Sequence, residues 1–317
     1  MINFNLAYCV YKIDYEKKFM EFKKITPDEM PLIWDYLRQE KGRTTDFSYG
    51  GVLMWIDYFK YEFAIENDTL FIKGVVENDL NKPAFSLPIG PHPLPNSVES
   101  LRKYCNENGL QLEFSAVPEY ALNDLKELMP TSIEELSDWG DYLYSAEKLS
   151  SLAGKKMEKK RNHVHQFQSH YPEYRIEELN KDNADDAMAF MDIFDKEGDS
   201  SELAAKEREL SRFLISRIKN GDKFLIGTVL YVGDQVAAYT IGDIKGDTLY
   251  IHVEKATRKF LGSYEMINYL FAKKICEQNP EIQFINREDD SGDPGLRLAK
   301  ESYHPLEILK KYNVIFD

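Results

Sequence analysis

Two very short turns in the second half of this 317-residue chain limit the folds that it can adopt. Gly233-Asp234 and Gly246-Asp247 separate three segments of strand character, at 223–232, 235–244 and 247–253. Two-residue turns that contain glycine join antiparallel strands, so these segments form a meander. The pattern of apolar residues predicts further helices and strands around the meander, at 175–179, 182–194, 202–219, 263–278, 282–286, 294–302 and 312–316.

The first half repeats this order in a shorter form. Strand patterns at 61–66, 69–76 and 84–89 precede a helix at 97–108 and a strand at 110–117. An antiparallel meander followed by α/β crossovers resembles the GNAT (acyl-CoA N-acyltransferase) topology. We therefore expect an α/β protein with mixed α+β sheets, made of two tandem GNAT-like domains in which the strand at 312–316 closes the second sheet. The expected divisions are an N-terminal extension at 1–20 with a second plausible start at Met20, a first domain at 21–138, and a second domain with the active cleft at 139–317.

Composition excludes several classes of function. The chain has 54 acidic and 40 basic residues, and its formal charge of −14 argues against non-specific binding to DNA, because affinity for phosphate depends on clustered Lys and Arg. Cys9, Cys105 and Cys276 form no CxxC pair, so neither a disulfide framework nor a zinc site is expected. No apolar run approaches the roughly 20 residues that a membrane span needs. We expect a cytoplasmic protein without a metal ion and without an integral membrane segment.

Basic residues gather in the segment that opens the second half. Lys155, Lys156, Lys159, Lys160 and Arg161 lie within seven residues, and on a helix they form one broad stripe. Such a stripe suits the phosphates of a coenzyme, a nucleotide or the end of a tRNA. The alternative is a solvated linker helix that pairs with the acidic remainder of the protein.

A glycine turn follows the third strand of the meander. Arg258, Gly262 and Ser263 lie where GNAT enzymes carry a glycine loop whose amides hold the pyrophosphate of coenzyme A, just before a helix N-terminus. The loop here has one glycine, so it departs from that pattern. We predict that these three residues bind the donor, with a glycine turn that caps a core helix as the alternative.

Acidic residues leave the strand at 282–286 beside another glycine turn. Glu288, Asp289 and Asp290 are candidates to hold an amine or act as general base, and Tyr303 is a candidate general acid. The residues predicted to bind the acceptor are Asn286, Arg297 and Lys300. The alternative is that the acids cap a helix and form an internal ion pair with Arg297.

The three segments together resemble the phosphatidylglycerol lysyltransferase C-terminal family, a tandem GNAT-like unit related to the Fem peptidyltransferases. The matching stretches are EKLSSLAGKKMEKKRNHVHQF, EKATRKFLGSYEMIN, the pattern N-x-E-D-x-x-G-x-x-GLR at 286–297 with the Lys and Pro that follow it, TTDFSYGGVLMW and FSLPIG. The resemblance covers about residues 21–317. It implies transfer of an activated acyl or aminoacyl group, from acyl-CoA or aminoacyl-tRNA, to an amine or hydroxyl. A non-catalytic GNAT-like module that binds a peptide or nucleotide is the alternative.

Overall fold

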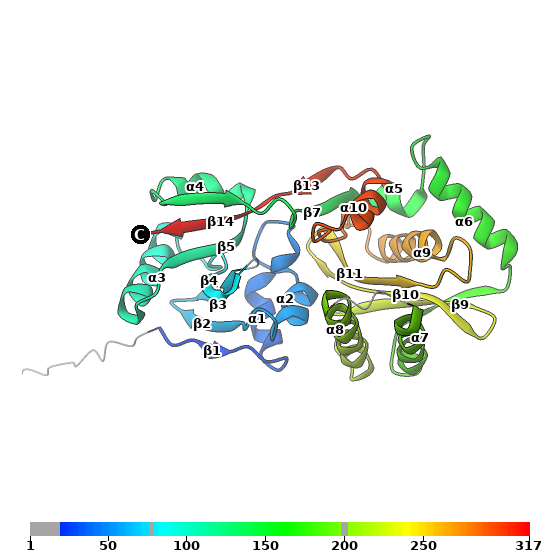
Figure 1. The fold of residues 1–317 in the computed structure, drawn as a ribbon, viewed down its shortest axis with the longest axis horizontal. Coiled ribbons are helices and arrows are strands. Elements are labelled where there is room, and N and C mark those ends of the chain that lie inside the picture. Colours follow the sequence, from blue (N-terminus) through cyan, green and yellow to red (C-terminus); the bar gives the residue numbers. More distant parts are fainter. Residues whose placement is uncertain (1–19, 77–78, 198–201) are drawn as a thin grey trace, which may run out of the picture.

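The structure is a computed structural model that describes residues 20–76, 79–197 and 202–317. Two α/β units lie side by side along the long axis of the molecule (Figure 1). Each contains a seven-stranded sheet in which antiparallel pairs are combined with one parallel pair. Helices α1 (Met30–Leu37) and α2 (Tyr49–Trp55) of the first unit lie between the two sheets.

The first sheet has the strand order β1-β2-β3-β4-β5-β14-β6, and β4 and β5 are its parallel pair. Its strands are β1 (Lys23–Lys24), β2 (Glu62–Glu66), β3 (Thr69–Val76), β4 (Asp79–Phe85), β5 (Leu112–Pro118), β6 (Ser132–Glu135) and β14 (Lys311–Phe316). The other helical elements of this unit are η1 (Thr45–Phe47), α3 (Leu94–Asn108), η2 (Glu119–Ala121) and α4 (Leu122–Lys126).

The second sheet has the order β13-β7-β12-β11-β10-β9-β8, with β11 and β12 as its parallel pair. Its strands are β7 (Asp141–Ser145), β8 (Tyr174–Glu178), β9 (Ile226–Val232), β10 (Gln235–Lys245), β11 (Thr248–Ala256), β12 (Phe284–Asn286) and β13 (Glu307–Leu309). The helices are α5 (Ala146–Ser151), α6 (Glu158–His170), α7 (Ala184–Glu197), α8 (Glu202–Lys219), α9 (Ser263–Gln278) and α10 (Pro294–Glu301).

The predicted meander is confirmed. Strand β10 pairs antiparallel with both β9 and β11, and Gly233 and Gly246 adopt the positive φ of 57° that these tight turns require. In both units one helix crosses over between the parallel strands, α3 from β4 to β5 and α9 from β11 to β12. The two units therefore share the order of a meander followed by an α/β crossover.

The C-terminal strand was assigned to the wrong sheet. Residues 312–316 were expected to close the second sheet, but β14 lies between β5 and β6 of the first sheet. The chain leaves the second sheet after β13 and returns to the first unit, as the red strand in Figure 1 shows. Alternating apolar residues identify a strand without specifying its partner, so the pattern could not distinguish the two sheets.

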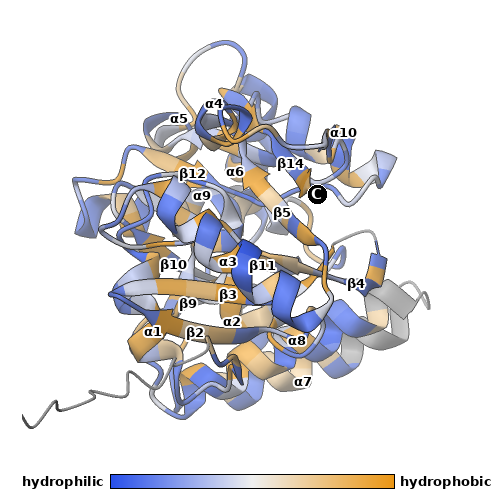
Figure 2. Ribbon diagram, turned by 90° about the vertical axis from the view of Figure 1, so that its left-hand side faces the viewer, coloured by the Kyte–Doolittle hydropathy of each residue, from blue (hydrophilic) through white to orange (hydrophobic). Residues whose placement is uncertain are grey.

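One hydrophobic core joins the two units. Ile33 of α1 and Leu53 of α2 belong to the same buried cluster as Val229, Tyr239 and Ile241 on one face of the second sheet. A second cluster fills the opposite face of that sheet, beneath α5, α6 and α9. In Figure 2 the strands β3 and β9 are largely hydrophobic, whereas α3 and α8 carry hydrophilic segments. Because the sheet is covered on both faces, its two faces can hold separate polar clusters.

Candidate functional site

A bulge in β11 turns His252 toward the first unit. Ile251 pairs with Gly242 and Val253 pairs with Ile241, so His252 is an extra residue in the ladder. Ile251 packs in the core under α9, whereas His252 faces α2 on the other side of the sheet. Bulges commonly re-aim a side chain in this way. The local backbone therefore places an imidazole at the contact between the two units.

His252 lies between two carboxylates. Its Nε2 is 2.8 Å from Asp243 Oδ2 on β10, and its Nδ1 is 2.7 Å from Glu288 Oε1 beyond the end of β12. The side chains of His252 and Asp243 are 0% and 1% exposed, and that of Glu288 is 21% exposed. Burial alone lowers the pKa of His252, but the charges and hydrogen bonds of Asp243 and Glu288 outweigh it and raise the pKa to about 10. The imidazole is therefore protonated at neutral pH and donates from both ring nitrogens.

The first unit completes this cluster. The Gly50 backbone N–H, in the first turn of α2, donates to Asp243 Oδ2 at 2.5 Å, and Thr45 Oγ1 donates to Glu288 Oε1 at 3.3 Å. First-turn N–H groups of a helix have no partner within the helix, so they can bind a carboxylate. A Cβ at Gly50 would collide with the His252 ring, so glycine allows the close approach. The site is therefore assembled from both units.

Asn286 orients the backbone around Glu288. Its side chain is fully buried and accepts from the Glu288 backbone N–H at 2.7 Å, while Nδ2 donates to the Arg43 carbonyl at 2.7 Å and to Asp141 Oδ2 at 2.9 Å. The Tyr142 N–H donates to the Glu288 carbonyl at 3.0 Å. Asn286 was predicted to bind the acceptor. Its three hydrogen bonds instead favour a role in holding Glu288.

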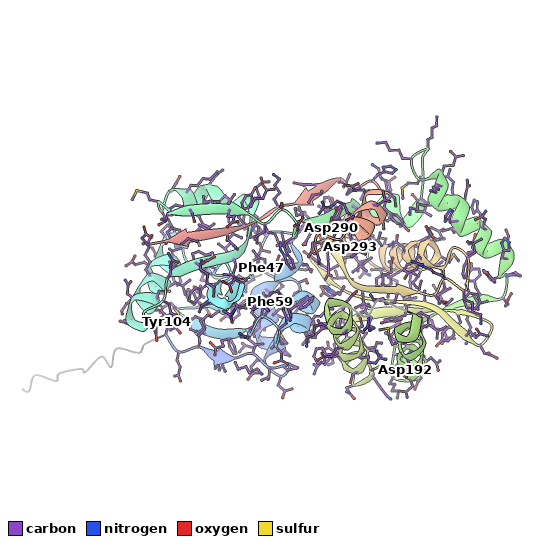
Figure 3. The ribbon with its side chains drawn as sticks, viewed as in Figure 1. Phe47, Phe59, Tyr104, Asp192, Asp290 and Asp293 are labelled. Carbon is purple, nitrogen blue, oxygen red and sulfur yellow. The ribbon has the colours of Figure 1, made fainter. Side chains whose placement is uncertain are left out.

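Asp290 forms the ion pair that the sequence left open as an alternative. It accepts from Arg297 Nε at 2.8 Å and Nη2 at 2.9 Å, from the Tyr142 hydroxyl at 2.6 Å and from the Gly292 N–H at 2.9 Å. Arg297 also pairs with Asp138 at 3.0 Å. The hydrogen bond from Arg297 is the main reason that the pKa of Asp290 falls to about 2. Figure 3 shows Asp290 beside α10, near the junction of the two units.

Lys300 and Asp289 belong to the same loop. Lys300 donates to the carbonyl oxygens of Arg287, at 2.6 Å, and of Asp289, and burial lowers the pKa of Lys300. Asp289 Oδ1 accepts from the backbone N–H and the hydroxyl of Ser291 at 2.8 and 2.9 Å. The predicted acceptor residues Arg297 and Lys300 thus brace the loop that carries Glu288.

Tyr303 lies on the other face of the second sheet, away from Glu288. Tyr303 is buried, and the Arg287 guanidinium lies over its ring, 4.7 Å from the ring centroid. Lys160 Nζ lies 3.9 Å from the centroid of the same ring. Arg287 bonds Glu254 at 2.9 Å, and Asn268 of α9 donates to Glu254 at 3.0 Å. Burial raises the pKa of Tyr303 well above its usual value. Among the predicted catalytic residues, the structure therefore separates Tyr303 from the acids.

The predicted basic stripe is not a helical stripe. Helix α6 begins at Glu158, so Lys155 and Lys156 lie in the turn before it, because Gly154 and the preceding loop interrupt the helix. Lys155, Lys156 and Lys159 are exposed, and within the described ranges none of them forms an ion pair. These three ammonium groups are available to a charged ligand.

The other two basic residues face inward. Lys160 pairs with Glu265 of α9 at 3.5 Å, and burial lowers the pKa of Lys160. Arg161 Nη1 donates to the carbonyl oxygens of Leu152 and Gly154 at 2.5 and 3.2 Å. The five predicted donor-binding residues therefore divide into an exposed group of three and an inward group of two.

The glycine turn before α9 is packed against α6. Gly262 has a φ of 84°, and a Cβ there would lie 2.7 Å from the His163 carbonyl oxygen. Ser263 is buried, and its hydroxyl donates to the Thr257 carbonyl at 2.7 Å. Arg258 is exposed on the turn. These contacts favour the alternative reading of the turn, as a cap on a core helix covered by α6.

Sequence reasoning missed His252 and Asp243. A lone acid inside an apolar strand and a histidine in the next strand, on either side of the turn at 246–247, were the available signal. A regular hairpin around that turn pairs Asp243 with Tyr250. The bulge that brings His252 to Asp243 has no sequence pattern that we could use.

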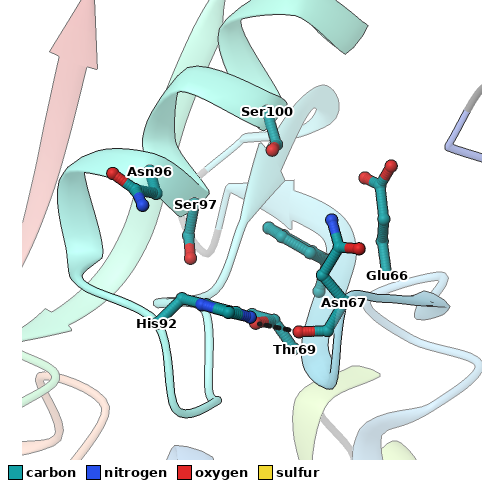
Figure 4. Close-up of a pocket in the computed structure, with 8 residues that line it drawn as sticks. Glu66, Asn67, Thr69, His92, Asn96, Ser97 and Ser100 are labelled. Carbon is teal, nitrogen blue, oxygen red and sulfur yellow. Dashed lines mark hydrogen bonds between the residues drawn. The ribbon is translucent and has the colours of Figure 1, made fainter.

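A shallow hollow of about 240 Å³ lies in the first unit, at the start of α3 (Figure 4). It is lined mainly by polar side chains, those of Glu66, Asn67, Thr69, His92, Asn96, Ser97 and Ser100, together with Phe71. Thr69 Oγ1 contacts the Asn67 carbonyl at 3.4 Å. Among the described residues, no hydrogen bond joins the side chains that line this hollow to Glu288 or His252. Over the same residues, no group of three or more His, Cys, Asp or Glu is arranged to hold a metal ion.

Several known proteins resemble this chain in structure or in sequence. A conserved protein of unknown function from Bacteroides thetaiotaomicron is 29% identical, with a TM-score of 0.84 over 94% of this chain and 100% of that chain. The C-terminal domain of a putative lysylphosphatidylglycerol synthetase from Agrobacterium fabrum is 11% identical, with a TM-score of 0.66 over 92% of each chain. An uncharacterized protein of Mycoplasmoides gallisepticum is 26% identical over 181 residues, and the chain spans 55% of the length of that curated relative.

The predicted fold of two tandem GNAT-like units is confirmed by the two mixed sheets and by this structural likeness. None of the helices in the described ranges combines the length and hydropathy needed to cross a bilayer. The family model described as "Phosphatidylglycerol lysyltransferase, C-terminal" matches residues 38–315. This chain therefore belongs to the phosphatidylglycerol lysyltransferase C-terminal family.

Proposed function

We propose that this protein transfers an aminoacyl group from aminoacyl-tRNA to an amine or hydroxyl acceptor, with Glu288 as the general base. The observation that carries the proposal is that the two oxygens of the Glu288 carboxylate have different surroundings. Oε1 is held by His252 and Thr45, whereas Oε2 makes no hydrogen bond with any described residue. The side chain is 21% exposed, so this second oxygen can receive a proton from an incoming group.

The reaction requires one proton transfer at the acceptor and one at the leaving group. The nitrogen or oxygen of the acceptor attacks the ester carbonyl carbon of the donor, and its proton passes to Glu288 Oε2. The ester C–O bond then breaks, and the same proton passes to the departing ribose oxygen. The products are an amide or a new ester and the uncharged tRNA, with Glu288 again a carboxylate. A base within hydrogen-bond reach contributes about 10²–10⁴-fold in rate.

The contacts of the glycine turn support a donor other than acyl-CoA. In the GNAT pattern the amides before the crossover helix hold a pyrophosphate, but here α6 packs on Gly262 and the Glu265 carboxylate occupies the first turn of α9. Carboxylate and phosphate repel each other at this position. The exposed residues at the N-terminal end of α6 are Lys155, Lys156 and Lys159, and a longer polyanion such as tRNA can reach them there.

Family membership also supports the transfer of an aminoacyl group, because the family description names a lysyltransferase. A donor of this kind is present in the cytoplasm, and we place the protein there. The acceptor is specified only by its chemistry, as an amine or a hydroxyl. The rival is a non-catalytic module that binds its ligand in the same place without turnover.

The test measures loss of radiolabelled amino acid from total tRNA charged with a mixture of amino acids. Acceptors are offered in parallel as phosphatidylglycerol vesicles, a short peptide amine and small amines, and acyl-CoA is tested as a competing donor. We expect the full chain to transfer label to at least one acceptor. Glu288→Gln should lower the rate about 10²–10⁴-fold, whereas the control Glu301→Gln, on the exposed side of α10, should not.

Three results would contradict the proposal or part of it. Equal rates for Glu288→Gln and the parent would remove Glu288 from the reaction. Binding of charged tRNA with no transfer to any acceptor would establish the binding module instead. Transfer from acyl-CoA rather than from charged tRNA would replace the proposed donor.

A further inference from the structure

We infer that His252 is a positioning residue whose orientation is set by the first unit, so that the seam between the units holds the Glu288 carboxylate in place. The seam is defined here as the contacts of residues 40–51 with the second sheet. This inference rests on the proposed function of Glu288 as base. It adds two residues, His252 and Asp243, and one backbone group, the Gly50 N–H, to the machinery of the site.

The chain of contacts is continuous from one unit to the other. The Gly50 N–H donates to Asp243 Oδ2, the same oxygen accepts from His252 Nε2, and His252 Nδ1 donates to Glu288 Oε1. Ser48 holds the start of α2 by accepting from the Gly51 N–H at 3.0 Å. Each of these hydrogen bonds restrains the orientation of the next side chain. A shift of α2 would therefore reach Glu288 through three hydrogen bonds.

The charge balance of the cluster explains why His252 can remain fully buried. The imidazolium is flanked by Asp243 from β10 and by Glu288 from the loop after β12, and α2 adds the positive end of its first turn through Gly50. Tyr250, which is buried near Asp243, adds no charge because burial raises its pKa well above its usual value. A buried cation is tolerated when it is paired and hydrogen-bonded.

Other charges along the seam are engaged with one another. Lys245 bonds Glu40 at 2.7 Å, and Arg43 pairs with Asp247 at 2.6 Å. Lys311 lies between Asp46 and Asp141, at 2.9 and 3.0 Å. These pairs satisfy their own members and join residues 40–46 to the second unit. Among the described residues, His252 is the cation that hydrogen-bonds the Glu288 carboxylate, so we expect its removal to change the position of Glu288 first.

The first measurement uses the full chain and needs no substrate. Long-range ¹H–¹⁵N NMR spectra distinguish a protonated imidazole from a neutral one, and each of the six histidines can be assigned by its own His→Gln variant. We expect His252 to stay protonated from pH 6 to pH 9 in the parent. Asp243→Asn should lower the pKa of His252 by about 1–3. A neutral His252 at pH 7 in the parent, or no change in Asp243→Asn, would overturn the inference.

The second measurement uses the transfer assay. His252→Gln should lower kcat by about 10–100-fold, as expected when a base is misplaced, and should leave KM within about twofold. The control is His170→Gln, at the exposed end of α6. An unchanged kcat for folded His252→Gln would overturn the inference.

Failure of this inference can be told apart from failure of the proposed function. If Glu288→Gln abolishes transfer and His252→Gln does not, the base stands and the positioning residue falls. If Glu288→Gln is fully active, the proposed function falls and this inference falls with it. If His252→Gln does not fold, the NMR titration of the parent and of Asp243→Asn still decides the outcome.

Discussion

The clearest test of how the loop at 286–303 works is Asp290→Asn. Asp290 is 3% exposed and accepts four hydrogen bonds, two of them from the Arg297 guanidinium. Asparagine keeps the shape but loses the charge, and its amide group would face donors on Tyr142, Gly292 or Arg297. Arg297 would keep Asp138 as a partner. We therefore expect a loss of stability and little direct effect on the chemical step.

The magnitude follows from the lowered pKa of Asp290. A pKa near 2 in place of the usual 3.8 corresponds to about 2 kcal/mol of stability. Because the folded-state pKa of Asp290 is depressed, this contribution is complete above about pH 4 and is lost as the pH falls through 2. Breaking a buried pair typically costs about 3–5 kcal/mol. Arg297 is 43% exposed and can be rehydrated, so we expect a loss of about 2–3 kcal/mol.

Urea unfolding of parent and variant between pH 8 and pH 3 measures this loss. The difference should be constant from pH 8 to pH 5 and should shrink below pH 4, while turnover per folded molecule stays within about twofold. The matched control is Asp289→Asn, whose hydrogen bonds stay within the exposed loop, and which should change stability by less than about 1 kcal/mol. A fully stable Asp290→Asn protein that loses turnover about 100-fold would refute the reasoning and make Asp290 catalytic.

Two further predictions concern the glycine turn before α9 and the exposed lysines at the start of α6. Gly262→Ala should destabilise the protein by about 1–3 kcal/mol in thermal unfolding, because the alanine would have a positive φ and its Cβ would collide with the α6 backbone. The control Gly154→Ala should cost less, because Gly154 also has a positive φ but has open space around it. Equal losses for the two would show that α6 does not press on the turn. Lys156→Ala combined with Lys159→Ala should weaken binding of charged tRNA, most strongly at low salt, as filter binding would show, and Lys126→Ala in the first unit should not. Unchanged affinity for charged tRNA would mean that these lysines are exposed surface residues that do not bind it.

The sequence was most informative about the fold where local rules determine structure. The turns at 233–234 and 246–247 have few possible geometries, so the meander β9-β10-β11 and the crossover α9 followed from them. The partner of β14 did not follow, because a strand pattern gives no information on which sheet receives it. The helix α6 started three residues later than the basic run because the turn after Gly154 precedes it.

The candidate site was predictable in part. The end of a strand beside a glycine turn identified Glu288, but its neighbours in sequence have different roles in space. Asp290 turns into the protein and pairs with Arg297. The Asn286 side chain is fully engaged by the Glu288 N–H, the Arg43 carbonyl and the Asp141 carboxylate. His252 could not be found, because its position depends on a bulge and on a helix some 200 residues earlier in the chain. Such contacts between distant segments leave no local pattern.

The central claim is that Glu288 accepts a proton during aminoacyl transfer. Single-turnover experiments with excess full-length protein and labelled charged tRNA measure this step directly, because substrate binding and product release do not limit the rate. We expect the parent to transfer the label to an amine or hydroxyl acceptor, and Glu288→Gln to bind the same tRNA equally well but to react about 10²–10⁴-fold more slowly. Equal single-turnover rates for the parent and Glu288→Gln would contradict the claim.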